Sequence, residues 1–255
     1  MVRRPRKQAI RKKPTLAPAP PPTLAALRKE LYALADPADA LHLQRFFKTA
    51  PGQYGAGDKF LGLRVPALRR MVKEYREIAD THALEMLASS WHEERLLALM
   101  LLVHQYGRGD RSRRDRIHGA YLAHTRYINN WDLVDASAVQ IIGSHLDARD
   151  ITLLKRLARS EDLWERRIAI VATFHFIKKN EFGPTLTIAE LLLQDSHDLI
   201  HKAVGWMLRE VGKRDLRALD AFLKKQYRKM PRTMLRYAIE RHPERVRKQY
   251  LAGTL

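Results

Sequence analysis

Two residues four positions apart, Trp131 and Asp135, form the pair in this sequence that is best suited to chemistry. They lie in the segment YINNWDLVD (127–135), where Asn130 precedes a helical pattern and is a good N-cap. On the predicted helix the two side chains share one face, with Asp135 at the edge of the apolar stripe. Asp132 points away from that stripe and suits the positive helix N-terminus. A half-buried carboxylate beside an indole is therefore either a partner for a neighbouring helix or a reactive group.

Arg167 is a second candidate, because it interrupts the apolar stripe of the helix predicted to begin at Trp164. Burying a lone charge is costly, so an arginine at such a position needs a partner. That partner is either a carboxylate such as Asp135 or an anion bound in a groove, and the two are compatible. The neighbouring Arg166 is expected to point more toward solvent.

Lys202, Trp206 and Arg209 share the face of the helix predicted over 199–211 that lies opposite its apolar face. Aromatic rings stack on bases, whereas lysine and arginine hold phosphates. A tryptophan between two cations therefore favours a binding face over a merely solvated one.

Metal and nucleotide chemistry find little support in the sequence. His197 and His201 have the spacing of a metal-binding pair, but no third ligand stands nearby and the zincin motif is missing. There is also no glycine-rich phosphate loop, nucleophile elbow or deaminase signature. We therefore expect neither a metal nor a cofactor.

The composition bounds the class of partner. The chain has 255 residues, 45% of them hydrophobic, with 47 Lys+Arg against 28 Asp+Glu and a net charge of +19. Such an excess favours a polyanion, most commonly nucleic acid, although an anionic membrane surface or a ribosome would fit the same charge. No apolar run approaches the roughly 18 residues of a membrane span. The absence of cysteine excludes disulfides and thiolate chemistry and fits a reducing compartment.

The N-terminal segment differs from the rest of the chain. Residues 1–22 hold seven Lys/Arg, no acid and many prolines, so we expect a disordered basic arm. The remaining +12 lies on residues 23–255, which are expected to form one domain. A flexible basic arm adds non-specific phosphate contacts.

From Thr23 onward the apolar pattern is helical nearly throughout, which predicts an all-α protein. A repeat is visible in the openings of five helices, at Trp91, Trp131, Trp164, Leu199 and Arg232, which are 40, 33, 35 and 33 residues apart. This period is typical of a HEAT-like repeat solenoid with a concave surface, a plain helical bundle being the alternative. The expected helices are Leu24–Ala33, Leu41–Phe47, Pro66–Ile78, Ala83–Ala88, Arg95–Tyr106, Asp115–His124, Trp131–Ile142, Ile151–Ala158, Trp164–Ile177, Leu186–Leu193, Leu199–Val211, Ala218–Tyr227, Thr233–Glu240 and Pro243–Tyr250.

Four segments in order carry a resemblance to a known family. They are NWDLVD (130–135), LWERR (163–167), KAVGWMLR (202–209) and MPRTMLRYAI (230–239), and together they resemble the AlkD-type DNA alkylation repair glycosylases. The likeness covers about residues 25–250. It implies a HEAT-like solenoid that binds duplex DNA in a concave basic groove. It also implies removal of cationic alkylpurines such as 3-methyladenine and 7-methylguanine.

The resemblance assigns roles to residues at matching positions. Asp135 would be the catalytic carboxylate, which stabilises the oxocarbenium-like sugar and positions a water molecule. The other expected site residues are Trp131 and Trp206 beside the lesion nucleotide, Arg167 supporting the site, Arg209 on the DNA backbone, Lys202 and Arg166 as further DNA contacts, and Tyr54 as the nearest counterpart of an early-loop tyrosine.

Two other functions fit the same residues. One is a non-catalytic solenoid that binds damaged or structured nucleic acid, and the other is a protein-binding HEAT scaffold. The Trp131/Asp135 pair together with Arg167 favours the glycosylase. We then expect duplex DNA with alkylated purines as partner, no membrane association, a monomer, and a cytoplasmic, nucleoid-associated location of the bacterial type.

Overall fold

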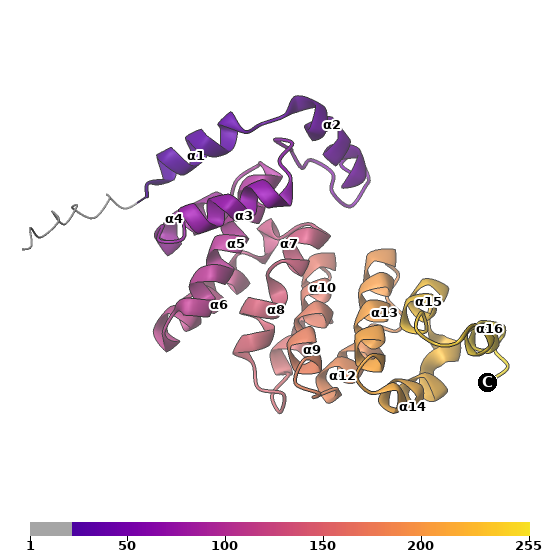
Figure 1. The fold of residues 1–255 in the computed structure, drawn as a ribbon. Helices are drawn as coiled ribbons and strands as arrows, with labels where there is room; N and C mark the ends of the chain where they lie inside the picture. The colour runs from indigo at the N-terminus through magenta and orange to yellow at the C-terminus, as the bar shows by residue number, and fades with distance from the viewer. Residues whose placement is uncertain (1–21) are drawn as a thin grey trace, which may run out of the picture.

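The computed structural model describes residues 22–255, which form helices joined by turns, with no β-strand among them (Figure 1). The all-α repeat solenoid predicted from the sequence is confirmed. The arm predicted over residues 1–22 lies, except for Pro22, outside the described residues. Within residues 22–255 no helix is long and apolar enough to cross a membrane.

A row of five helices forms the spine of the solenoid. They are α5 (His92–Arg108), α7 (Trp131–Asp135), α10 (Leu163–Ala172), α13 (Asp198–Gly212) and α15 (Arg232–Ala238). Each contacts the next in the row. These helices begin at or beside the five repeat openings found in the sequence, so the repeat is a structural one.

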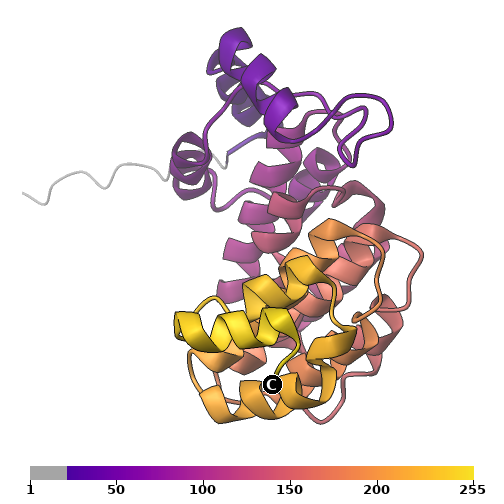
Figure 2. The same cartoon turned by 90° about the vertical axis from the view of Figure 1, so that its right-hand side faces the viewer.

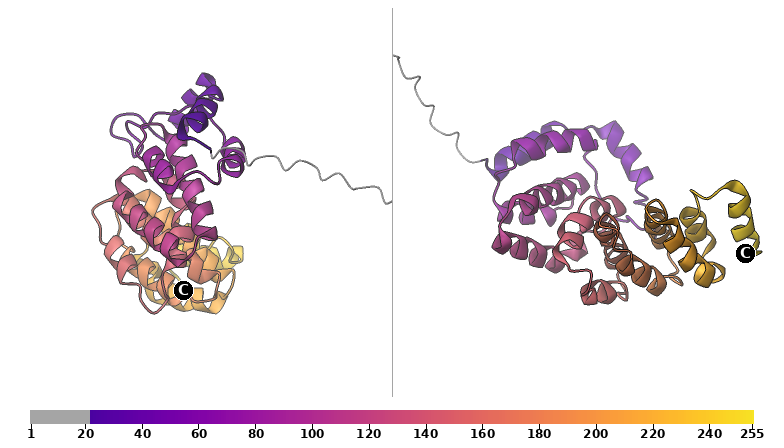
Figure 3. Two further views of the ribbon diagram at one scale, coloured as in Figure 1. Left: turned by 90° about the vertical axis from the view of Figure 1, so that its left-hand side faces the viewer. Right: turned by 60° about the horizontal axis from the view of Figure 1, so that its bottom comes forward.

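A second layer of helices packs on this row. Its members are α4 (Asp80–Leu87), α6 (Arg111–Ala123), α9 (Thr152–Leu157), α12 (Gly183–Leu191), α14 (Leu216–Gln226) and α16 (Glu244–Ala252). The helix pairs follow one another along an arc (Figures 1 and 3). The N-terminal helices gather at one end and the C-terminal helices at the other (Figure 2).

The N-terminal helices form a cap on this arc. They are α1 (Leu24–Ala33), α2 (Pro37–Phe46) and α3 (Val65–Glu74), and the short helices α8 (Ala138–Ile141) and α11 (Phe174–Ile177) complete the described fold with 3-10 turns at Thr125–Tyr127, Gly143–His145 and Tyr227–Lys229. The continuous core fills the space between the layers. A separate small cluster, Ala40, Leu43, Phe47 and Phe60, joins α2 to the loop after it, and Trp131 packs against this cluster.

Two helices that the pattern predicts as continuous, 131–142 and 164–177, are each interrupted. At the first break the Ser137 hydroxyl donates to the carbonyl four residues earlier, at 2.6 Å. At the second break the Thr173 hydroxyl donates to the carbonyl three residues earlier, at 2.7 Å. Such side-chain bonds compete with the helical ladder. Asp135 consequently ends α7 instead of lying inside a long helix.

Candidate functional site: a cleft and a buried network on either side of Trp131

One cleft of about 570 Å³ brings together six of the eight site residues predicted from the sequence. In Figure 1 the C-terminal end of α2 lies above the upper ends of α10 and α13. All three helices contribute residues to the lining of this cleft. The lining residues are Phe46, Tyr54, Trp131, Arg167, Leu199, Lys202, Ala203, Trp206, Arg209 and Tyr237. Segments far apart in the chain thus meet at the cleft, which takes residues from α2, the loop after it, α7, α10, α13 and α15.

Asp135 does not itself line this cleft, but it is held by Arg167, which does. The guanidinium donates to both carboxylate oxygens, from Nε at 3.0 Å and from Nη2 at 2.8 Å. Its remaining nitrogen donates to the carbonyl of Leu199 at 2.9 Å. The Arg167 side chain is 7% exposed and that of Asp135 is 22% exposed. Of the two partners that the stripe pattern allowed for Arg167, the structure shows the carboxylate of Asp135, and this pair joins α7, α10 and α13.

Burial and charge act in opposite directions on Asp135. Burial raises the pKa of its carboxyl above the ordinary value, and the Asp132 charge adds to that, while Arg167 lowers it. The net shift is upward. Arg167 therefore counteracts much of the burial cost and holds the carboxylate in one orientation.

Aromatic side chains frame the cleft. Trp131 stacks on Phe47, with ring centroids 5.1 Å apart, and meets the edge of Phe46 at 5.8 Å. Tyr54 packs edge-on against Trp164 at 6.1 Å. Burial raises the pKa of the Tyr54 hydroxyl, so it stays a neutral donor. Sequence reasoning missed Phe46, which is 56% exposed. A large apolar residue at an exposed helix end was the available signal.

The cations of the cleft are already paired with carboxylates. Lys202 bonds to Asp198 one turn earlier on α13, at 2.7 Å, and this bond raises the pKa of the lysine. Arg209 forms an ion pair with Glu240. A phosphate approaching the cleft would compete with these carboxylates for both cations.

Arg166 lies away from the cleft, and as expected its side chain is more exposed than that of Arg167, which is 7% exposed. The Arg166 side chain is 17% exposed and donates to Asp195 at 2.6 Å. His197 and His201 serve the same turn: His197 caps α13 by accepting from the Leu199 N–H, and His201 bonds to the Asp195 carbonyl. These residues therefore fix the entry to α13.

On the other side of Trp131, Asp132 belongs to a buried network. Its Oδ2 bonds to His92 Nε2 at 2.8 Å, and the other ring nitrogen of His92 bonds to Asp58 at 3.2 Å. Asp58 also accepts from Arg95 at 2.7 Å and from Asn129 at 3.0 Å. The sequence interpretation of Asp132 as only a helix-end charge is therefore incomplete, because a buried histidine from 40 residues earlier has no signature in local periodicity.

The pKa shifts of His92 and Asp58 both favour the charged form of the side chain. Burial alone would lower the pKa of His92, but Asp132 and Asp58 outweigh it and raise the pKa to about 9. Burial likewise opposes ionisation of Asp58, yet bonds from His92 and the Arg95 charge lower its pKa. At neutral pH His92 is thus an imidazolium between two carboxylates.

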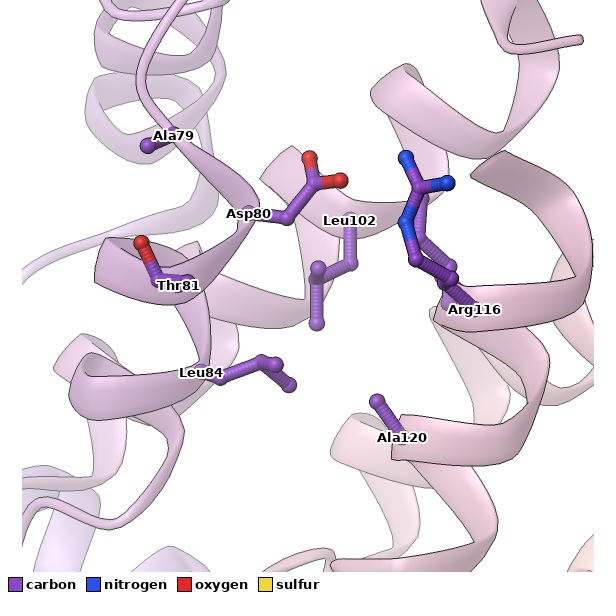
Figure 4. A pocket seen from close by; sticks show the side chains of 8 residues that line it. Ala79, Asp80, Thr81, Leu84, Leu102, Arg116 and Ala120 are labelled. Atoms are coloured by element: carbon purple, nitrogen blue, oxygen red, sulfur yellow. The ribbon is translucent and has the colours of Figure 1, made fainter. Parts of the chain in front are cut away.

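Another hollow, of about 390 Å³, lies between α4 and α6 (Figure 4). Leu84, Leu102 and Ala120 line it, and its acidic residue Asp80 is held by Arg113 through bonds of 2.6 to 3.2 Å. This hollow contains none of the predicted site residues. We interpret it as a gap between packed apolar side chains and not as a functional site.

Comparisons with known proteins show the family and the fold of the chain. The family model described as DNA alkylation repair enzyme matches residues 27–242. A solved structure, a predicted DNA alkylation repair enzyme from Enterococcus faecalis, superposes with a TM-score of 0.63 at 17% identity, covering 82% of this chain and 97% of that one. Among curated proteins none matches the sequence. The family match spans most of the chain, and the chain therefore belongs to the family of DNA alkylation repair enzymes.

Proposed function

We propose that this DNA alkylation repair enzyme is a monofunctional glycosylase that hydrolyses the N-glycosidic bond of cationic alkylated purines in duplex DNA. 3-Methyladenine and 7-methylguanine are the class of base it would remove. The observation that carries the proposal is the Asp135 carboxylate, which is fixed by two bonds from Arg167, and Arg167 lines a cleft together with Trp131 and Trp206.

The chemistry of the leaving group explains why one carboxylate suffices. An N3- or N7-alkylated purine already carries positive charge, so it departs without a general acid. As the bond to C1′ breaks, the sugar gains oxocarbenium character. Asp135 stabilises that charge and orients the attacking water molecule. The negative faces of nearby indole rings favour cationic character as well.

DNA binding is assigned to the cleft and its surroundings. Lys202 and Arg209 reach into the cleft and hold phosphates once they exchange their carboxylate partners for them. Tyr54 and Trp206 supply the aromatic contacts. The net charge of +19 draws duplex DNA to the protein. The continuous core of the described residues needs no second copy, so we infer a monomer acting on DNA in the cytoplasm.

Release of free bases tests the proposal. Methylated duplex DNA is incubated with the protein and the released 3-methyladenine and 7-methylguanine are quantified. Wild type is expected to release both, and Asp135→Asn to do so about 100- to 1,000-fold more slowly, as when a stabilising group is removed from a transition state. Asp132→Asn is the matched control on the same helix and is expected to lose far less.

The same experiment identifies the alternatives. A non-catalytic solenoid that recognises damaged DNA would bind the methylated duplex with either aspartate replaced and would release nothing. A protein-binding scaffold would show negligible affinity for duplex DNA at moderate salt. If Asp132→Asn proves more damaging than Asp135→Asn, the catalytic assignment within α7 is wrong.

A further inference from the structure

The positive charge of the folded chain is concentrated at its C-terminal end. Residues 216–255 hold 11 Lys+Arg against 3 Asp+Glu, a net charge of +8, whereas residues 23–215 carry a net charge of only +4. Each of the three acids of this end already bonds to one basic side chain. These acids therefore do not neutralise the other cations around them.

Four of these cations form a row, here named the α14 stripe, on α14 and the 3-10 turn that follows it. Arg217 and Lys224 are seven residues apart, which is two helical turns, and so share one face of α14. Lys225 adjoins Lys224, and Lys229 ends the 3-10 turn. All four side chains are exposed, and none forms an ion pair within the described part of the chain.

The α14 stripe and the cleft lie on different sides of α13. As a member of the second layer, α14 packs against the buried side of α13, where Leu219 leaves no room for a side chain at Gly212. Lys202 and Trp206 of α13 line the cleft. In Figure 1 α14 lies at the lower edge of the arc, whereas α2 lies above the upper end of α13. A duplex held in the cleft is therefore separated from the α14 stripe by α13.

Another helix of the second layer, α6, is also rich in arginine but uses it differently. Each of its four arginines donates to another protein group: Arg111 to Asp115, Arg113 to Asp80, Arg114 to the Tyr106 carbonyl and Arg116 to Ser112. Such bonds satisfy a guanidinium within the fold. The cations of the α14 stripe have no carboxylate partner, so ion pairing inside the protein does not account for them.

We propose that the α14 stripe is a second binding surface for duplex DNA, separate from the cleft. A row of unpaired cations attracts a polyanion, and DNA is the polyanion on which this family of repair enzymes acts. Arg217 and Lys224 lie about 10 Å apart along α14, and the phosphates of one strand recur about every 3.4 Å along the duplex axis. The α14 stripe is therefore long enough to contact several phosphates of one strand.

Phosphate contacts also determine what this surface recognises. They carry no sequence information, so the α14 stripe binds undamaged duplex of any sequence. One monomer then holds one DNA segment in the cleft and a second segment on the α14 stripe. The second segment stays at a high local concentration beside the first. This surface goes beyond the proposed glycosylase, because it requires no base release.

Capture of one duplex by another tests the proposal. An undamaged biotinylated duplex is fixed on beads, and a fluorescent duplex is added together with the full-length protein at low salt. Wild type is expected to retain the fluorescent duplex on the beads. The double variant Lys224→Gln/Lys225→Gln should retain about tenfold less or lower still, because each lost phosphate contact weakens binding.

A matched control is available on another helix of the second layer. Lys155 and Arg156 are adjacent, exposed cations in the last turn of α9, as Lys224 and Lys225 are in the last turn of α14. Lys155→Gln/Arg156→Gln removes the same charge and should capture as much duplex as wild type. Neither pair lines the cleft, so both variants should release alkylated bases at the wild-type rate on saturating methylated duplex. Thermal unfolding checks that both variants are folded.

The outcomes separate this proposal from the glycosylase itself. If wild type captures no second duplex, or the α14 variant captures as much as wild type, the α14 stripe is not a DNA surface and the glycosylase is unaffected. Equal losses in the two variants would mean that overall charge, and not the α14 stripe, holds the second duplex. If only the α14 variant loses capture, the second surface is confirmed, even where wild type releases no base and the glycosylase proposal fails.

Two further measurements exclude other readings of the capture. A dimer that bridges duplexes through two clefts would capture equally well with the α14 variant, which overturns the proposal, and sedimentation velocity reports such a dimer directly. Vesicles containing phosphatidylglycerol test an anionic membrane as the partner. If the α14 variant loses vesicle binding while its capture of duplex is unchanged, the α14 stripe serves a membrane surface and the proposal is wrong.

Discussion

The two carboxylates of α7 lie three residues apart and have different surroundings. Asp135 has one cationic partner, Arg167, which lines the cleft. Asp132 bonds to His92, which is itself held by Asp58. A carboxylate with a single partner beside a cleft can meet a ligand without disturbing the fold. A carboxylate in a network transmits any change to every element that the network joins.

The Asp132 side also anchors the loop after α2. Besides His92, the first turn of α5 contains Glu93, whose carboxylate accepts from the backbone N–H groups of Leu61, Gly62 and Leu63 at 2.8 to 3.1 Å. The loop therefore cannot move without breaking buried bonds. Its attachment fixes Phe60, and through Phe60 the rings of Phe47 and Trp131. The comparison thus contrasts the carboxylate proposed to react, Asp135, with a structural anchor, Asp132.

Replacing Asp58 should have the largest effect on stability. Asp58→Asn leaves the His92 and Arg95 cations buried without their shared carboxylate, so we expect the free energy of unfolding to fall by about 3–5 kcal/mol. Urea unfolding measures this. The control is Asp80→Asn, whose ion pair with Arg113 is partly exposed and should cost below about 1 kcal/mol. Equal losses of unfolding free energy in the two variants would contradict the distinction between the buried network of Asp58 and the partly exposed Asp80–Arg113 pair.

His92 gives this anchor a specific pH dependence. Its folded pKa of about 9 lies above the ordinary 6.5, so its contribution is complete below 6.5 and is lost as pH rises through 9. Between those values wild type should lose about 3 kcal/mol relative to His92→Gln. His118 is half-buried and has its pKa lowered from 6.5 to about 4, so its effect is opposite: stability is lost as pH falls from 6.5 toward 4. His118→Gln is therefore a control of opposite sign, and a His92 profile without alkaline loss would contradict the imidazolium.

The pKa of Asp135 should determine the pH dependence of the proposed base release. The pKa of Asp135 is raised above 3.8 by burial, and the proposed mechanism requires its ionised form, so the acid limb of kcat/KM for base release should lie above that ordinary value. Arg167→Met removes the contribution that lowers the pKa and should move the acid limb further toward neutral pH. The pH profile of both proteins, corrected for spontaneous depurination, measures this. An unchanged limb would mean that Asp135 does not limit the rate.

Periodicity in the sequence was sufficient for the repeats and for most of the cleft. Apolar spacing places Lys202, Trp206 and Arg209 on one face, and an arginine in an apolar stripe indicates a buried pair, so both features follow from local rules. The helix breaks at Ser137 and Thr173 could not be predicted in this way. A single hydroxyl that bonds to a backbone carbonyl leaves the spacing of apolar residues unchanged.

Contacts between segments that are distant in the sequence could not be predicted from the local spacing of residues. The Asp58–His92–Asp132 network joins residues 34 and 40 positions apart, and nothing in the spacing of either segment indicates it. Phe46 was missed for the same reason, since its place beside Trp131 depends on how the loop folds back. The ion pair of Arg166 with Asp195 was not predicted either, because the two residues are 29 positions apart.

Replacing the cation Lys202 should have the smallest of these effects, a change in affinity for duplex DNA. It also tests most directly where the DNA backbone lies. Lys202 and Lys248 both pair with an acid four residues earlier, Asp198 and Glu244, but only Lys202 lines the cleft. Lys202→Ala should weaken duplex binding uniformly across sequences and reduce the salt slope by about 1, whereas Lys248→Ala should leave both unchanged.

The acid beside Lys202 predicts an opposite effect. Asp198→Ala frees the lysine from its bond of 2.7 Å, so it should tighten duplex binding at low salt, with the gain fading as salt is added. Fluorescence anisotropy at several salt concentrations measures both changes. Because Asp198 lies in the first turn of α13, its loss also weakens the helix end slightly, which thermal unfolding would report separately. If Asp198→Ala weakens binding while the fold is retained, the phosphate does not compete for Lys202, and the DNA backbone must cross the arc elsewhere than beside Asp135.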